Sequence, residues 1–251
     1  MTFLQTPPSP TFPGKGETGC IPAVVQFWHG TQPPEIAELM ETWRQSSAEG
    51  FEYLDFDAET ARDFIRMHYD QRTEDAFLTC AVPAMKADFF RICALLVRPG
   101  IYVDADTRRS GARFRRQPPG ESSASLMKLY QQLDRGLLFR REERIANGFM
   151  IVKRKRDPLL LAILGKAIHN IENRTSNNVY MVTGPGIATK LLNEFGVEHK
   201  YFRGFEFWTQ EALLPYMRLV GGLPYKQTND HWVNAQKIGS IFVSGPRSRS
   251  S

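Results

Sequence analysis

Short apolar segments alternate with helical segments along the first part of the chain, and this alternation limits the possible folds more than any other feature. Residues 23–28 (AVVQFW), 51–55 and 101–104 have the pattern of buried or half-buried strands. Residues 34–46, which begin at a proline pair, and residues 83–97 carry apolar side chains at helical spacing. Strands separated by crossover helices predict an α/β fold with a largely parallel sheet.

Changes in composition divide the chain into three parts. Residues 1–20 hold four prolines and three glycines and predict a flexible arm, and the Ser/Arg-rich residues 244–251 predict a disordered tail. Residues 21–243 are enough for a single α/β domain. Within it, residues 108–125 contain five arginines and predict a mobile basic surface segment, and residues 179–182 predict a further strand before a turn and a helix.

The charge balance is mildly basic, with a net charge of +5 and an isoelectric point of about 9.1. Such a balance suits anionic ligands such as nucleotide diphosphates, and equally nucleic acid or an anionic membrane surface. The arginine-rich stretch 108–116 invites a nucleic-acid interpretation. It carries no interleaved aromatic residues and no recognised motif, so we predict no nucleic-acid partner.

Cysteine usage and the N-terminus bear on the cellular location. Cys20, Cys80 and Cys93 are an odd number without a CxxC pair, which argues against a disulfide framework or a zinc site. Cys80 and Cys93 stand in apolar contexts and are predicted to be buried thiols. The first residues show no signal peptide, and no run of 18 apolar residues occurs. We therefore expect a cytoplasmic protein, with peripheral contact at the inner face of the membrane as an alternative.

Two aspartates, Asp104 and Asp106, stand one residue apart at the end of the apolar strand 101–104. Ligands of open α/β sheets bind beyond the carboxyl ends of strands, and strand alternation would place both side chains on one side. Two close carboxylates repel each other unless a cation compensates them, and Mg²⁺ or Mn²⁺ prefers oxygen ligands. The alternative interpretation is a solvated turn, since a lone D-x-D pattern is common by chance.

Asp88 and Arg91 are three residues apart in the helical segment 83–97 and therefore share one surface of that helix. A short Pro-Gly turn joins the helix to the strand before Asp104, which allows both side chains to reach the same cleft. The fork of donors on an arginine can bind phosphate or sugar hydroxyls. The alternative is an ordinary ion pair on a solvated helix face.

These residues stand in a pattern that resembles the DXD-motif sugar transferase family, which includes the yeast-type initiating mannosyltransferases and, more distantly, the glucosylating clostridial toxins. The family pattern A-x-x-A-D-x-x-R-x-x-x-L, a glycine-bearing turn and I-Y-x-D-x-D is reproduced without a gap over residues 84–106. Residues 21–28 (IPAVVQFW) are similar to the family's first strand. The family also has less specific motifs later in its sequence. Three segments of this chain resemble them, residues 147–150, 183–185 and 231–232.

The resemblance implies a GT-A-like (Rossmann-like) α/β fold with a nucleotide-sugar half, about 21–110, and an acceptor-side half, about 111–243. It implies a retaining glycosyltransferase that depends on Mn²⁺ or Mg²⁺. The donor would be a UDP- or GDP-sugar and the acceptor a saccharide or glycolipid. The expected role is the synthesis of a surface polysaccharide or another glycoconjugate.

The resemblance also implies roles for the matched residues. The implied catalytic residues are Asp88, Arg91, Asp104 and Asp106. Asp104 would contact the donor ribose or sugar, and Asp106 would ligate the metal. Asp88 and Arg91 would hold the donor sugar and its phosphate. The base pocket would be lined by Phe27 and Trp28, and His231 would lie near the diphosphate or the metal.

Three departures from the family pattern concern donor and acceptor preference, and one of them is the unusually arginine-rich segment 108–125. The turn before the Asp104 strand has one glycine, Gly100, where the family usually has two, and Ala23 stands where lysine is common. A catalytically silent nucleotide-sugar binding protein is one alternative function. A phosphatase of the haloacid-dehalogenase type is another, but its strand-end motif requires a threonine where Arg108 stands.

Overall fold

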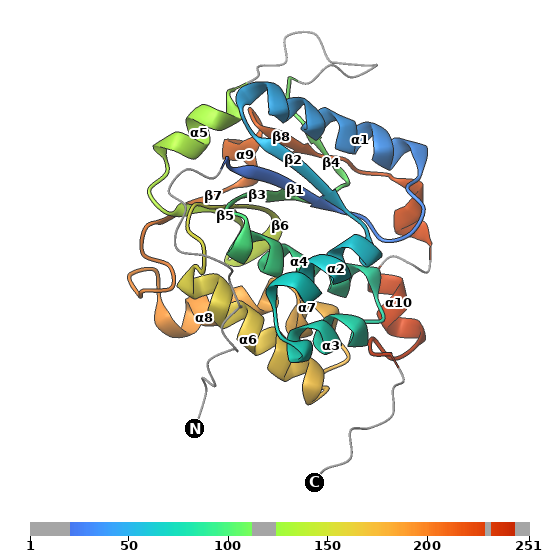
Figure 1. The fold of residues 1–251 in the computed structure, drawn as a ribbon. Coiled ribbons are helices and arrows are strands. Elements are labelled where there is room, and N and C mark those ends of the chain that lie inside the picture. The colour runs from blue at the N-terminus through green and yellow to red at the C-terminus, as the bar shows by residue number, and fades with distance from the viewer. Residues whose placement is uncertain (1–20, 112–123, 229–231, 244–251) are drawn as a thin grey trace.

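A computed structural model describes residues 21–111, 124–228 and 232–243, and these residues contain a six-stranded sheet with helices on both faces (Figure 1). The order of strands across the sheet is β2-β1-β3-β6-β5-β7. The strands are β1 (Ala23–Phe27), β2 (Glu52–Phe56), β3 (Gly100–Val103), β5 (Gly136–Arg141), β6 (Arg144–Val152) and β7 (Phe205–Trp208). A smaller sheet pairs β4 (Thr107–Arg109) with β8 (Met217–Leu219).

Five strands of the main sheet run in the same direction, and β6 runs against them. β1 pairs in parallel with β2 and β3, and β5 pairs in parallel with β7. β6 is antiparallel to both β3 and β5. The predicted α/β class with a mostly parallel sheet is therefore confirmed, and the reversed strand is an addition that the sequence did not predict.

Helices form one layer on each side of the sheet (Figure 1). α2, α3, α4, α6, α7 and α8 pack on one face, and α1, α5 and α9 pack on the other, beside the small sheet. Their bounds are α1 (Pro34–Arg44), α2 (Ala58–His68), α3 (Gln71–Thr79), α4 (Pro83–Val97), α5 (Leu126–Gln132), α6 (Pro158–Glu172), α7 (Val179–Val182), α8 (Gly186–Phe195), α9 (Gln210–Leu213) and α10 (Trp232–Ile238). Two 3-10 helices are η1 (Gln45–Glu49) and η2 (Pro224–Gln227).

The alternation of side chains along the central strands fills two separate cores. In β1, Val25 and Phe27 face the layer that contains α4, whereas Val24 faces the layer that contains α1. In β3, Tyr102 faces the layer that contains α4, and Val103 faces the layer that contains α1. Strands buried on both faces therefore read as continuous apolar runs, which is why β1 and β3 were recognisable from the sequence.

Local signals explain where the main helices begin. α1 and α4 each start at a proline in the first turn, where a missing N–H costs nothing. The Asp57 carboxylate accepts a hydrogen bond from the Thr60 amide at 2.8 Å and caps α2. At the end of α4, Gly100 opens β3, and a Cβ atom there would collide with the Ala23 carbonyl of β1. The single glycine in this turn is thus the one that close approach of β3 to β1 requires.

Two sequence predictions are wrong. Residues 179–182 form the short helix α7, capped by the Asn178 side chain, and not a strand. A four-residue apolar run does not distinguish a strand from one turn of buried helix, and the cap and the tertiary contacts decide.

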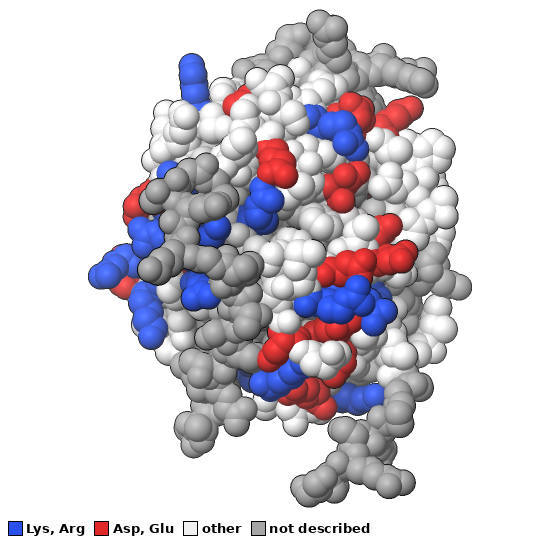
Figure 2. Space-filling view, in the orientation of Figure 1, with Lys and Arg blue, Asp and Glu red and all other residues white. Residues whose placement is uncertain are grey.

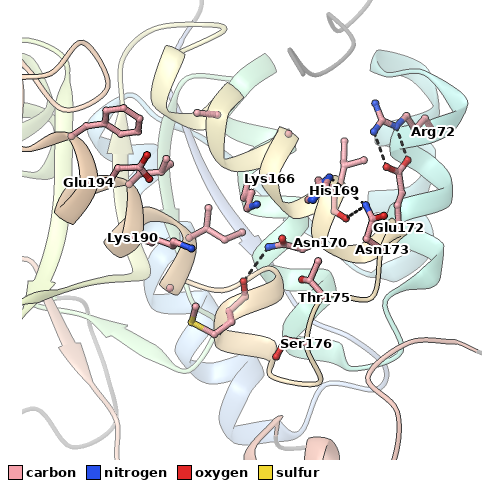
Figure 3. A pocket seen from close by; sticks show the side chains of 18 residues that line it. Arg72, Lys166, His169, Asn170, Glu172, Asn173, Thr175, Ser176, Lys190 and Glu194 are labelled. Atoms are coloured by element: carbon pink, nitrogen blue, oxygen red, sulfur yellow. Dashed lines mark hydrogen bonds and ion pairs between the residues drawn. The ribbon is translucent and has the colours of Figure 1, made fainter. Parts of the chain in front are cut away.

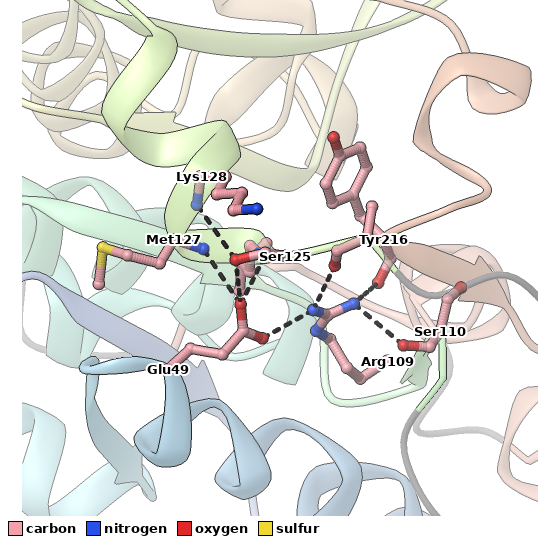
Figure 4. Close-up of polar contacts among 9 residues, drawn as sticks. Glu49, Arg109, Ser110, Ser125, Met127, Lys128 and Tyr216 are labelled. Carbon is pink, nitrogen blue, oxygen red and sulfur yellow. Dashed lines mark hydrogen bonds and ion pairs between the residues drawn. The ribbon is translucent and has the colours of Figure 1, made fainter.

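The second wrong prediction concerns the start of the basic segment 108–125. Arg108 and Arg109 lie in the buried strand β4. Arg109 donates to Glu49 at 2.8 Å and also to the Tyr216 carbonyl (Figure 4). Glu49 accepts from the Leu126 amide at the start of α5. This network fixes β4 and α5 to η1. The rest of that prediction, over residues 112–123, lies outside the described residues, as do the predicted arm 1–20 and tail 244–251.

On the face drawn in Figure 2, basic side chains are more frequent towards the left edge and acidic ones towards the right, with some of the opposite sign among each. Several of the charges pair with each other, as Arg62 does with Glu74 at 2.6 Å and Arg66 with Asp63 at 2.6 Å. Cys80 and Cys93 are buried free thiols, as predicted. None of the described helices has the length and apolar character needed to cross a bilayer.

Candidate active site

A crevice of about 1080 Å³ opens at the carboxyl ends of β1 and β3. Its walls come from the end of β1, from one side of α4, from the first half of β6 and from the segment that follows β8. The carboxyl edge of a parallel sheet is the usual place for a ligand in open α/β folds. The crevice therefore occupies the position at which the sequence places Asp104.

Arg91 is the centre of the polar groups in this crevice. It projects from α4 and is 3% exposed, with one guanidinium nitrogen 2.9 Å from Asp88 Oδ1 and another 3.2 Å from Asp104 Oδ1. The guanidinium carbon lies 4.3 Å from the centre of the Tyr102 ring. A single buried cation thus joins a carboxylate of the helix to a carboxylate at the strand end, and the ring fixes its plane.

The antiparallel strand β6 supports both carboxylates from the opposite side. Asn147 Nδ2 donates to Asp88 Oδ1 at 2.8 Å, and the Asn147 carbonyl accepts from Arg91 Nη1. The Gly148 carbonyl accepts from the Asp104 amide at 2.8 Å. A Cβ atom on Gly148 would lie 2.5 Å from Asp104 Oδ2, so only glycine leaves the Asp104 carboxylate in its place. Sequence reasoning grouped these two residues in a weak motif and gave them no role.

Asp106 reaches the crevice by a different route from Asp104. β3 ends at Val103, and the Thr107 amide donates to the Asp104 carbonyl at 3.1 Å, which closes a turn. The extended geometry that would align the two side chains therefore does not persist. Asp106 Oδ2 instead accepts from the Tyr225 hydroxyl at 2.7 Å and pairs with Lys226 Nζ at 2.7 Å. Nothing in the sequence pattern connected residues 225 and 226 with this site.

Burial changes the proton affinity of the carboxylates. Desolvation raises the pKa of Asp88 to about 6, although Arg91 and Asn147 act against this rise. Desolvation also raises the pKa of Asp104; Arg91 opposes that rise, and the neighbouring Asp106 carboxylate adds to it. Shifted carboxyl groups that face a crevice are characteristic of functional sites, where a ligand or ion completes the charge balance.

Aromatic side chains form the wall of the crevice at the end of β1. Phe27 is buried, and Trp28 is half-buried beside it. The Trp28 ring lies 5.1 Å from the Tyr225 ring, edge to face, and both rings line the crevice. Trp28 Nε1 donates to the Thr31 carbonyl at 3.2 Å, which holds the indole in place. A flat apolar surface is thus available a short way from the carboxylates.

The implied metal can be tested against the donor atoms present. Among the described residues no cluster of three or more His, Cys, Asp or Glu side chains exists, and His231 lies outside them. Asp104 and Asp106 supply carboxylate oxygens, and their side chains are 37% and 20% exposed to the crevice. Mg²⁺ in proteins commonly uses one or two carboxylates and takes its other ligands from substrate phosphates and water. The two aspartates therefore fit a divalent cation that arrives with a phosphate ligand.

A second cavity, of about 750 Å³, lies among α6, α7 and α8 (Figure 3). The polar groups labelled there mostly join helices to one another. Arg72 pairs with Glu172 at 2.6 Å, and Asn170 donates to the Met181 carbonyl at 3.1 Å. These contacts join helices and do not place several carboxylates around one buried cation as at Arg91, so the crevice at β3 is the better candidate for chemistry.

The fold and the crevice together define an α/β protein with buried charged side chains facing a crevice at the carboxyl edge of its sheet. Residues 33–110 match the family model of the glycosyltransferase sugar-binding region containing a DXD motif. This range includes Asp88, Arg91, Asp104 and Asp106. The predicted resemblance to DXD sugar transferases is thereby confirmed for this region, and the match supports a role in sugar transfer.

Solved structures and curated proteins give two further comparisons. The solved structure of the PaToxG glycosyltransferase is similar to this chain at 15% sequence identity, with a TM-score of 0.45, and the similarity covers 96% of this chain and 91% of that chain. No curated protein matches the chain in sequence.

Proposed function

We propose that the protein is a metal-dependent, retaining glycosyltransferase that moves a hexose from a nucleotide-diphosphate sugar to a saccharide or glycolipid acceptor. The observation that carries the proposal is the joint position of Arg91, Asp88 and Asp104 beside Asp106, at the sheet edge and within the matched DXD region. We place the donor against residues 21–110 and the acceptor mainly against residues 111–243.

The donor would be held by charge and by shape. Arg91 has a rigid fork of donors and would bind a phosphate or sugar oxygen that replaces part of its contact with Asp104. Asp88 is fixed by Asn147 and would accept hydrogen bonds from sugar hydroxyls when it is ionised. Phe27 and Trp28 would pack against the base. These contacts would orient the anomeric carbon towards the open side of the crevice.

The metal would be held by Asp106, with Asp104 as the second carboxylate, and we expect Mn²⁺ or Mg²⁺. When bound, it would stabilise the negative charge that develops on the leaving diphosphate. We keep His231 as a candidate ligand from the sequence resemblance. Arg91 would add a fixed positive charge on the protein side of the same leaving group.

Each of the three carboxylates already has hydrogen-bond or ion-pair partners, and this favours front-face attack without a covalent intermediate. Asp88 is held by Arg91 and Asn147, Asp104 by Arg91, and Asp106 by Tyr225 and Lys226. A carboxylate used as a nucleophile must leave such contacts to reach the anomeric carbon. In the proposed step the acceptor oxygen bonds to the anomeric carbon, the bond to the diphosphate breaks on the same face, and a diphosphate oxygen takes the hydroxyl proton.

Donor and acceptor are proposed at the level of chemical class. The donor would be a UDP- or GDP-sugar, and the acceptor would belong to a surface polysaccharide or another glycoconjugate. We propose a cytoplasmic location, with peripheral contact at the inner face of the membrane where the acceptor is a glycolipid.

A screen of nucleotide sugars tests the proposal. Nucleotide release from UDP- and GDP-sugars is measured with and without Mn²⁺, for the wild type, Asp106→Ala and the surface control Asp63→Ala. We expect release from at least one donor, dependence on Mn²⁺, and a loss in Asp106→Ala alone. Donor binding without release would favour the silent binding protein. Release of phosphate from p-nitrophenyl phosphate, abolished in Asp104→Asn, would favour the phosphatase.

A further inference from the structure

The segment that follows β8 places a cation directly on the DXD aspartate. η2 presents two neighbouring side chains to Asp106, the Tyr225 hydroxyl at 2.7 Å and the Lys226 ammonium at 2.7 Å, and both contact the same oxygen, Oδ2. Lys226 also donates to the Val220 carbonyl at 3.3 Å. The two contacts with Asp106 join residues that are more than one hundred positions apart in the sequence, 119 in the case of Tyr225.

The Lys226 contact is incompatible with a divalent cation on the same oxygen. A carboxylate oxygen has two in-plane lone pairs, and two donors, the Tyr225 hydroxyl and the Lys226 ammonium, already contact this oxygen. A metal ion bound about 2.1 Å from a carboxylate oxygen would lie close to an ammonium held at hydrogen-bond distance from it. The two positive charges would repel each other strongly in a crevice shielded from water.

The crevice offers Lys226 another partner. Its side chain is 34% exposed, and it lines the same crevice as Arg91 and Trp28, into which the phosphates of a donor would extend. An ammonium carries three N–H donors on a flexible stem, so Lys226 can change its acceptor and still hold the Val220 carbonyl.

We propose that Lys226 and the divalent cation compete for Asp106, and that Lys226 transfers its charge to the diphosphate when the cation takes the carboxylate. This inference rests on the proposed function and names a residue that acts on the leaving group from outside the matched DXD region. Lys226 then has two roles. It neutralises Asp106 before the donor binds, and it binds the diphosphate afterwards.

The two roles give opposite effects in one variant, Lys226→Met, which keeps the length of the stem and removes the charge. The affinity for Mn²⁺ alone rises about three- to tenfold, because Asp106 loses its competing cation, and the affinity for UDP or GDP in the presence of Mn²⁺ falls by about the same factor. Mn²⁺ binding is measured by the electron paramagnetic resonance of free Mn²⁺. Nucleotide binding is measured by isothermal titration calorimetry.

Two further variants control the experiment. Lys237→Met removes an exposed lysine of α10 outside the crevice and leaves both affinities unchanged. Tyr225→Phe removes the other donor to Asp106 Oδ2, so it raises the Mn²⁺ affinity and leaves diphosphate affinity within about twofold. Circular dichroism of each variant establishes that it is folded. If Lys226→Met does not fold, the Mn²⁺ affinity of Tyr225→Phe tests the competition for Asp106.

The outcomes separate this inference from the proposed function. If the wild type binds both Mn²⁺ and a nucleoside diphosphate but Lys226→Met shifts the two affinities in the same direction, or shifts neither, the role of Lys226 is refuted and the proposed function stands. If the wild type binds neither probe, both proposals fail.

Discussion

Within the part of the chain that the structure describes, two arginine–aspartate groups are buried, and they differ in what surrounds them. Arg135 pairs with Asp157 through two nitrogens at 2.6 and 2.8 Å and donates to the carbonyls of Lys200 and Arg203. Asp157 is fully buried and also accepts from the Leu159 amide at the start of α6. One cation faces one carboxylate here, and backbone groups use the remaining hydrogen-bonding positions.

The charge balance around Arg91 is different, because the carboxylates outnumber the cation. It faces two carboxylates, Asp88 and Asp104, with a third, Asp106, nearby, and one side of this group opens on the crevice. The charge of Asp104 is only partly compensated, and its pKa is raised. The comparison teaches that a buried ion pair is part of the scaffold when its partners are all supplied by the fold. It is a candidate for function when an excess of one charge faces a cavity.

The largest effect is expected at the Arg135–Asp157 pair, which we call the closed pair because the fold supplies all of its partners. Arg135→Ala leaves Asp157 buried without its cation, and the free energy of unfolding falls by about 3–5 kcal/mol. Nucleotide release per folded molecule stays within about twofold of the wild type. Urea denaturation measures the first quantity and the donor assay the second. Arg154→Ala, at an exposed arginine 3.7 Å from Asp134, is the control and changes stability by less than about 0.5 kcal/mol.

Arg91→Lys is expected to reduce activity strongly and stability only moderately, the reverse of the effect at Arg135. Lysine keeps the positive charge but loses the fork that spans Asp88 and Asp104, so the rate of nucleotide release falls about a hundredfold, or about 2.7 kcal/mol in the barrier. Stability falls by less than in Arg135→Lys, the matched variant at the closed pair. Steady-state rates and denaturation midpoints of the two variants test this contrast, and a larger stability loss at Arg91 than at Arg135 would contradict it.

A pH series sharpens the comparison at Asp88. Its pKa is raised from 3.8 to about 6 in the folded protein, so between these values the folded state holds a proton that the unfolded state has released. The stability that Asp88 contributes is complete below pH 3.8 and is lost as the pH rises through 6. The wild type therefore loses stability between about pH 4 and about pH 7, and Asp88→Asn does not. The free energy of unfolding of the variant minus that of the wild type increases by about 1–3 kcal/mol over this range.

Urea denaturation across this pH range measures the difference for Asp88→Asn, with Asp134→Asn at an exposed position as the control. A difference that stays constant with pH for Asp88→Asn would show that Asp88 does not take up a proton in this range. Because ionised Asp88 is the form proposed to bind the sugar, the rate of nucleotide release should also rise as the pH passes through 6.

The smallest expected effect is that of Gly148→Ala. The added Cβ would lie 2.5 Å from Asp104 Oδ2, so the carboxylate must turn away from its place beside Arg91. We expect nucleotide release to fall about tenfold, which corresponds to about 1.4 kcal/mol. Gly221→Ala is the control, because nothing lies within 4 Å of a Cβ atom there although Gly221 also lines the crevice. Equal rates for the two variants would show that the position of Asp104 is not critical.

Local signals, together with the resemblance of residues 84–106 to the DXD family pattern, were enough to select the residues from α4 and β3. Asp88 and Arg91 are recognisable because three-residue spacing places them on one helix surface, and Asp104 and Asp106 because they follow an apolar strand. The parallel part of the sheet was predictable for the same reason, since strands buried on both faces have continuous apolar sequences.

The remaining parts of the site depend on contacts that no local pattern encodes. Asn147 meets Asp88 across 59 positions of sequence, and Tyr225 meets Asp106 across 119. Their proximity results from the reversed direction of β6 and from the pairing of β8 with β4. The burial of Arg108 and Arg109 was missed for a similar reason, because a charged residue is buried only when a distant partner, here Glu49 for Arg109, compensates it.

The reversed strand has a consequence for protein engineering. Because β6 runs against its neighbours, the β5–β6 hairpin turns at Glu142 and Glu143 near the crevice, which Arg141 lines, and Asn147 follows soon after this turn. Asp88 and Asp104 project from α4 and from the end of β3, but the same strand β6 holds them, Asp88 through the Asn147 side chain and Asp104 through the Gly148 carbonyl. A loop grafted between Glu142 and Glu143 would thus add new surface near the crevice, and it would also act on the strand that holds Asp88 and Asp104, so a graft here must leave the position of Asn147 unchanged.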